Sequence, residues 1–60
     1  MDGDKIRALR KKLDLSQKDL SLELGVSKRT VENWEQGTRF PSEENERKLK
    51  ELQDGKASVR

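Results

Sequence analysis

Residues 16–37 constrain the fold of this chain more than any other stretch, and they read SQKDLSLELGVSKRTVENWEQG. A serine precedes each of two short segments, at Ser16 and Ser27, and a glycine follows each of them, at Gly25 and Gly37. Serine accepts hydrogen bonds from the free N–H groups that begin a helix, and glycine adopts the left-handed conformation that ends one. The stretch therefore predicts two short helices joined by a tight turn at Gly25.

The apolar residues of the two segments fall at helical spacing. Leu20 and Leu24 share one face of the first helix, Val31 and Trp34 share one face of the second, and Val26 lies in the turn between them. Residues three or four apart are neighbours on a helix, so we expect these two faces to pack together. The outward-facing side chains of the second helix are Lys28, Arg29, Thr30 and Asn33.

A further helix is expected before this pair, beginning near Asp4. Ile6, Leu9 and Leu13 recur at i, i+3 and i+7, which places one apolar stripe along such a helix. An acid near the start suits a helix N-terminus, either as its cap or in its first turn. We expect residues 1–3 to be loose.

A fourth helix is expected near the C-terminus. Residues 38–41 form a loop, because Pro41 cannot continue a helix, and Ser42 supplies a new N-terminal cap. Leu49 and Leu52 are three residues apart and make a narrow apolar stripe.

Charged residues support the fourth helix, and the composition of the last residues indicates where the domain ends. Glu46 and Lys50 are four residues apart in the favourable order for a helical ion pair, worth about 0.3 kcal/mol. Residues 53–60 carry mixed charge and a glycine, and we expect a flexible C-terminal tail there. The predicted domain is therefore residues 4–52.

Length and composition weigh against several classes of function. Sixty residues allow one domain, and the chain has no histidine or cysteine to bind zinc or to act as a nucleophile. With 28% apolar residues, a deep pocket is not expected. We therefore expect no enzyme, catalytic residue, metal, cofactor or small-molecule substrate. No apolar run is long enough to span a membrane, so a cytoplasmic location without a membrane partner is expected.

The first turn of the helix at residues 28–36 carries residue types suited to reading DNA. An α-helix fits the major groove, where Lys28 and Arg29 can donate to guanine O6 and N7. Asn33 lies one turn further along the same face and can pair with adenine. A net charge of +2 does not by itself indicate nucleic acid, and each of these side chains is also common on an ordinary solvated helix face.

Residues 17–36, with Arg10 before them and the Pro41–Ser42 helix start after them, resemble the helix-turn-helix of the XRE, phage-repressor and Cro (lambda-repressor-like) family. The resemblance covers roughly residues 4–52. It implies an all-α, compact four-helix DNA-binding domain whose second and third helices form the helix-turn-helix. Members of this family usually add an apolar fifth helix, which is apparently missing from the ending DGKASVR.

The resemblance also implies roles for individual residues. The residues expected to reach base edges are Lys28, Arg29, Asn33 and Thr30. The residues expected to contact phosphates are Gln17, Ser27, Thr38 and Arg39. Gln17 is further expected to brace a side chain of the third helix. Arg10 and Glu35 are expected to form a structural ion pair, and Trp34 is expected to pack in the core.

We therefore expect a sequence-specific double-stranded DNA-binding protein that regulates transcription, as a repressor, with its third helix in the major groove. A homodimer on DNA would match two half-sites. The alternative is a protein-interaction module of the same fold, resembling an antitoxin or a regulator-binding protein. Such a module would use the fourth helix and residues 53–60.

Overall fold

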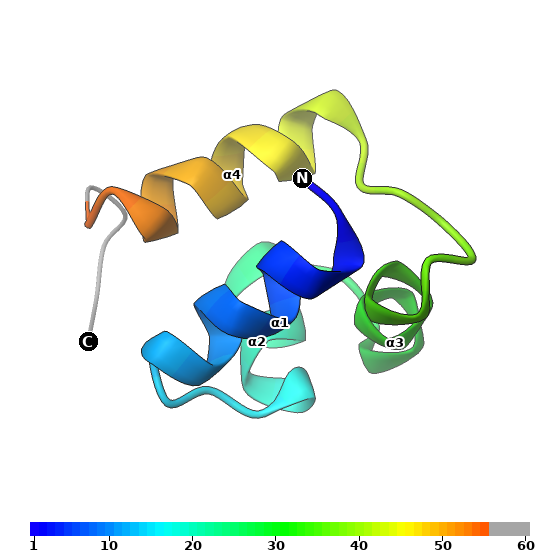
Figure 1. Ribbon diagram of the computed structural model, residues 1–60, viewed down its shortest axis with the longest axis horizontal. Coiled ribbons are helices and arrows are strands. Elements are labelled where there is room, and N and C mark those ends of the chain that lie inside the picture. The colour runs from blue at the N-terminus through cyan, green and yellow to red at the C-terminus, as the bar shows by residue number, and fades with distance from the viewer. Residues whose placement is uncertain (56–60) are drawn as a thin grey trace.

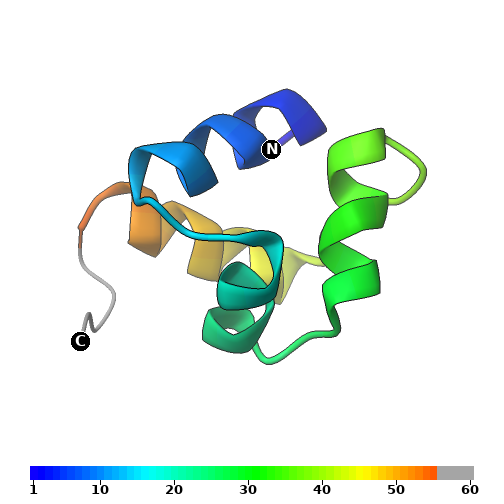
Figure 2. The ribbon, with the colours of Figure 1, turned by 90° about the horizontal axis from the view of Figure 1, so that it is seen from below.

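The computed structural model describes residues 1–55, which form four helices (Figure 1). These are α1 (Gly3–Lys12), α2 (Gln17–Leu24), α3 (Lys28–Gln36) and α4 (Glu43–Gln53). α1 and α4 run in roughly the same direction, and α3 stands across them at one end (Figures 1 and 2). In this part of the chain no helix is both long enough and apolar enough to cross a membrane.

Short-range hydrogen bonds begin α2, α3 and α4 at the serines where the sequence predicted them. Ser16 Oγ accepts from the N–H of Asp19 at 3.0 Å, and Asp19 Oδ2 accepts from the N–H of Ser16 at 3.2 Å, which completes a capping box. Ser27 Oγ and Ser42 Oγ accept from the N–H groups of Thr30 and Asn45, which caps α3 and α4. Gly25 ends α2 with a φ of 72°, so the tight turn depends on a left-handed residue.

Each helix contributes two apolar side chains to a single core. The buried apolar residues are Ile6, Leu9, Leu20, Leu24, Val31, Trp34, Leu49 and Leu52. Full burial of a leucine, isoleucine or valine side chain is worth about 1.5–3 kcal/mol, so this small cluster is the main source of stability. The predicted all-α, four-helix fold is confirmed.

The prediction that residues 1–3 are loose is wrong. Asp2 caps α1, because its Oδ1 accepts from a backbone N–H of the first turn at 2.9 Å. Met1 packs against the core, and its ammonium nitrogen lies 3.4 Å from Glu46 Oε2. Among the described residues, Glu46 therefore pairs with the chain terminus and not with Lys50 as predicted.

Gly3 explains why the chain is ordered from its start. A Cβ atom at Gly3 would lie 2.5 Å from the carbonyl oxygen of Trp34 and 2.7 Å from that of Glu35. These distances are too short for any side chain. The first turn of α1 can therefore approach the backbone of α3 only because residue 3 is glycine.

The end of α1 also differs from the prediction. α1 stops at Lys12, and Leu13 is 37% exposed, so Leu13 does not continue the buried stripe. Asp14 adopts a left-handed conformation with a φ of 58°, and the N–H of Leu15 bonds to the carbonyl of Arg10 at 2.9 Å. This bond closes the helix end, and Leu15 packs against the core in place of Leu13.

The prediction of a tail beginning at residue 53 is wrong in its first residue. Gln53 belongs to α4, and Asp54 forms its C-terminal cap. Residues 56–60 of the predicted tail lie outside the described residues.

Replacing Gly3 with alanine should destabilise the fold by about 1–3 kcal/mol, because the added Cβ meets two backbone carbonyls that cannot move independently of α3. This cost outweighs the roughly 0.5–1 kcal/mol by which alanine usually favours a helix over glycine. Urea denaturation followed by circular dichroism measures the change. Lys11→Ala, at an exposed position of the same helix, should change stability by less than about 0.5 kcal/mol. A Gly3→Ala variant as stable as wild type would contradict the close approach.

Candidate nucleic-acid interface

α3 presents two different faces. Val31 and Trp34 are buried in the core, with exposed fractions of 0% and 3%. Lys28 and Arg29, in the first turn, are exposed. The apolar face therefore fixes how α3 is rotated, and the two cations project away from the core.

The N-terminal end of α3 is organised by its cap. Ser27 Oγ accepts from the N–H of Thr30 at 3.2 Å and lies 2.9 Å from Thr30 Oγ1. Lys28 Nζ lies 3.8 Å from Glu32 Oε2, and both groups are partly exposed. An exposed pair of this kind contributes only about 0.3–0.5 kcal/mol, so Lys28 can leave Glu32 for another anion at little cost.

The other end of the candidate interface is a shallow hollow of about 340 Å³ between α3 and α4. Thr30 and Asn33 of α3 line it together with Arg39 of the following loop. The hollow therefore brings two side chains predicted to reach bases next to one predicted to contact phosphate. Thr38 is exposed in the same loop, and its N–H donates to the carbonyl of Asn33 at 3.0 Å.

Phe40 and Asn45 also line this hollow and were not among the predicted site residues. Phe40 is the only phenylalanine in the chain, and its large apolar side chain is 72% exposed. Their positions depend on the path of the loop that joins α3 to α4. Local sequence patterns do not report that path.

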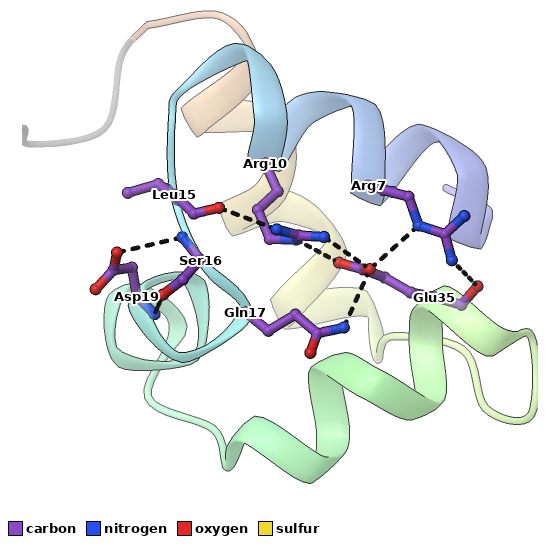
Figure 3. Close-up of polar contacts among 7 residues, drawn as sticks. All are labelled: Arg7, Arg10, Leu15, Ser16, Gln17, Asp19 and Glu35. Carbon is purple, nitrogen blue, oxygen red and sulfur yellow. Dashed lines mark hydrogen bonds and ion pairs between the residues drawn. The ribbon is translucent and has the colours of Figure 1, made fainter.

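Glu35 anchors the back of α3 to α1 (Figure 3). Arg10 Nε donates to Glu35 Oε2 at 2.7 Å, and Arg10 Nη2 donates to Oε1 at 3.1 Å. This two-bond arrangement is the strongest geometry for a guanidinium and a carboxylate. Arg10 Nη1 also donates to the carbonyl of Leu15 at 3.1 Å, which ties the α1–α2 connection to the same pair.

Two further side chains converge on Glu35 (Figure 3). Gln17, at the start of α2, donates through Nε2 to Glu35 Oε1 at 3.2 Å. Arg7 donates to Glu35 Oε1 at 3.4 Å and to the Glu35 carbonyl at 3.5 Å. The sequence prediction did not include Arg7. Its position three residues before Arg10, and so on the same side of α1, could have indicated it.

The Glu35 carboxylate is charged although the residue is only 6% exposed. Burial by itself would raise its pKa, but hydrogen bonds from Arg10, Gln17 and Arg7 and the charge of Arg10 together lower the pKa below its ordinary value. The hydrogen bond to Glu35 likewise raises the pKa of Arg10, against the opposing effect of burial. α1, α2 and α3 are therefore held by one satisfied ionic centre.

Comparison with known proteins agrees with this architecture. Residues 6–52 match a protein-family model described as helix-turn-helix. The matched span runs from Ile6 in α1 to Leu52 in α4 and includes the whole core. No curated protein matches the chain.

Glu35→Gln should lower the free energy of unfolding at pH 7 by about 3 kcal/mol, because it leaves the Arg10 charge partly buried without its counter-ion. Since the folded-state pKa of Glu35 is lowered, its stabilising effect is complete above the ordinary value of 4.5 and is lost as the pH falls below it. Urea denaturation at pH 7 and pH 3 should therefore show a smaller acid-induced loss for Glu35→Gln than for wild type. Glu51→Gln, at an exposed position of α4, is the matched control. Equal acid-induced losses in wild type and Glu35→Gln would contradict the assignment.

Proposed function

We propose, since this chain belongs to the XRE (lambda-repressor-like) helix-turn-helix family of DNA-binding domains, that it is a sequence-specific regulator of transcription whose α3 reads the major groove of double-stranded DNA. The observation that carries the proposal is the fixed orientation of α3. Its apolar side is buried, Glu35 is bonded to α1 and α2, and Lys28 and Arg29 are left exposed. A helix must be held rigidly to align its side chains with base edges.

The base-reading residues in this proposal are Lys28, Arg29, Asn33 and Thr30. Lys28 and Arg29 suit guanine, whose O6 and N7 are both acceptors in the major groove. Asn33 suits adenine, which presents one acceptor and one donor there. The methyl group of Thr30 can contact a thymine methyl, while its hydroxyl stays bonded to Ser27.

The phosphate contacts in this proposal flank the reading helix. They come from Gln17, Ser27, Thr38 and Arg39. One amide N–H of Gln17 donates to Glu35, and the second remains for a phosphate oxygen. Ser27 and Gln17 also stand at helix N-termini, where backbone N–H groups and the helix dipole attract anions. Such contacts position the domain, whereas the base contacts specify the sequence.

The proposed regulatory mechanism is repression by occupancy of a promoter. The proposed domain is residues 4–52. Two copies would bind half-sites about one helical turn, roughly 34 Å, apart. A pair of domains doubles the number of phosphate contacts, which compensates for the small charge of one copy.

The double variant Lys28→Ala, Arg29→Ala should lose the DNA sequence that wild type selects from random duplexes. Each bidentate contact to guanine is worth about 1–3 kcal/mol of discrimination, so enrichment of a G-containing motif should vanish. Lys11→Ala, Lys50→Ala removes the same charge from exposed positions outside α3 and should keep the motif. Circular dichroism checks that both variants fold. If both variants select the wild-type motif, α3 is not the reader.

The affinity for duplex DNA should fall steeply with salt. Only positively charged side chains displace counterions from DNA, so Lys28, Arg29 and Arg39 together give a slope of log K against log salt of about −3 per domain, and a dimer doubles it. Fluorescence anisotropy between about 50 and 200 mM salt measures this slope, and Arg39→Ala should reduce its magnitude by about 1 per domain. An affinity that does not change with salt would refute the mechanism.

A further inference from the structure

A second hollow lies between α1 and α4, and no residue of α2 or α3 lines it. Its volume is about 1040 Å³. It exists because α1 packs mainly on α3, and α4 packs mainly on α2, so that the two have little direct contact. Figures 1 and 2 show them running side by side in the same direction. We call this hollow the α1–α4 groove.

Positive charge dominates the α1–α4 groove. Its cationic side chains are Lys5 and Lys12 on α1 and Arg47 and Lys50 on α4. All four residues are exposed, and none of these side chains takes part in a hydrogen bond or ion pair within residues 1–55. The ammonium of Met1 adds a fifth cation, against the carboxylates of Glu43 and Glu46. Five cations against two carboxylates leave an excess of three positive charges.

The positions of these cations are only partly explained by helix stability. Lys12 and Lys50 lie near the C-terminal ends of their helices, where each gains about 0.3–1 kcal/mol from the helix dipole. Lys5 lies near the N-terminal end of α1, where the dipole disfavours a cation. The shared feature of the four side chains is therefore the groove that they line.

The floor of the groove is apolar. Ala8 and Leu9 lie between Lys5 and Lys12 on α1, and Met1 lines the groove beside them. Ala8 is exposed, whereas Leu9 is a core residue that is only 5% exposed. α1 has 10 residues, so at about 1.5 Å per residue the groove wall is roughly 15 Å long. This length matches between two and three turns of another helix. An apolar floor with cationic edges is complementary to a helix that carries an apolar stripe flanked by carboxylates.

We propose that the α1–α4 groove docks an acidic amphipathic helix of a partner protein, on a surface separate from α3. This inference goes beyond DNA binding and assigns the domain a protein partner of defined chemistry. A second copy of this chain is a poorer occupant. If two grooves faced each other, each would bring an excess of three positive charges, and the two copies would repel each other. A nucleic acid would satisfy the cations but would leave the apolar floor without a matching surface.

The test uses the full chain and a synthetic two-heptad helical peptide with leucine at the a and d positions and glutamate beside them. Two control peptides carry glutamine or lysine in place of glutamate. We expect the glutamate peptide to bind at least about tenfold more tightly than the glutamine peptide, as measured by fluorescence anisotropy at low salt. Backbone amide shifts in NMR spectra should concentrate at Lys5, Ala8, Leu9, Arg47 and Lys50.

A charge-reversed groove variant, Lys12→Glu with Lys50→Glu, should bind the glutamate peptide about tenfold more weakly and should gain affinity for the lysine peptide. The matched control is Lys11→Glu with Lys18→Glu, which makes the same change of charge at exposed positions outside the groove. This control should bind the glutamate peptide within about twofold of wild type.

Several results would overturn the proposal. These are equal binding of the glutamate and glutamine peptides, an equal loss in the groove variant and its control, or amide shifts confined to α3. A dimer in sedimentation velocity that the groove variant abolishes would instead assign the groove to a second copy. Duplex DNA binding, measured on the same variants, should survive reversal of the groove charges, and its loss would assign the groove to nucleic acid. If no peptide binds while duplex binding is intact, the groove proposal alone fails.

Discussion

The buried carboxylate of Glu35 is the interaction on which the position of α3 depends. A charged group with so little exposure is costly unless other groups replace its water. Arg10 and Arg7 on α1 and Gln17 on α2 provide that replacement, with the two bonds from Arg10 as the closest contact. One charge therefore joins three of the four helices. The apolar core adds most of the stability, and the ionic centre disfavours other positions of α3, because a shift that broke these bonds would leave a buried charge without its partners.

The exposed surfaces follow from this arrangement. With Glu35, Val31 and Trp34 facing inward, the first turn of α3 projects its cations outward beside the α3–α4 hollow. The same packing draws α1 towards α3 and α4 towards α2, which opens the α1–α4 groove. The domain therefore carries two separate cationic surfaces. One is polar and is centred on a helix of the width of the major groove. The other has an apolar floor of Ala8 and Leu9.

Sequence-based prediction located a helix end where the interacting residues are close together in the chain, and it failed where they are far apart. The capping box of Ser16 and Asp19 joins residues three apart, so the pattern alone located the start of α2. The beginning of α1 could not be located in this way, because Asp2 and Asp4 are both good helix-starting residues. The choice between them depends on Gly3, which fits against the carbonyls of α3, more than thirty residues further along the chain. Leu13 has helical spacing but lies just beyond the helix, so spacing alone overestimated the buried stripe.

The sequence by itself determined that there are four helices, the caps of α2, α3 and α4, and most of each apolar face, because these result from contacts within about four residues. It also indicated which side chains α3 presents, since burial of Val31 and Trp34 leaves Lys28 and Arg29 outside. Only the tertiary structure decided what those helices bring together. Three features join residues from different helices. They are the hydrogen bonds to Glu35, the hollow between α3 and α4, and the groove between α1 and α4. Their geometry depends on the packing of whole helices, which no local pattern encodes.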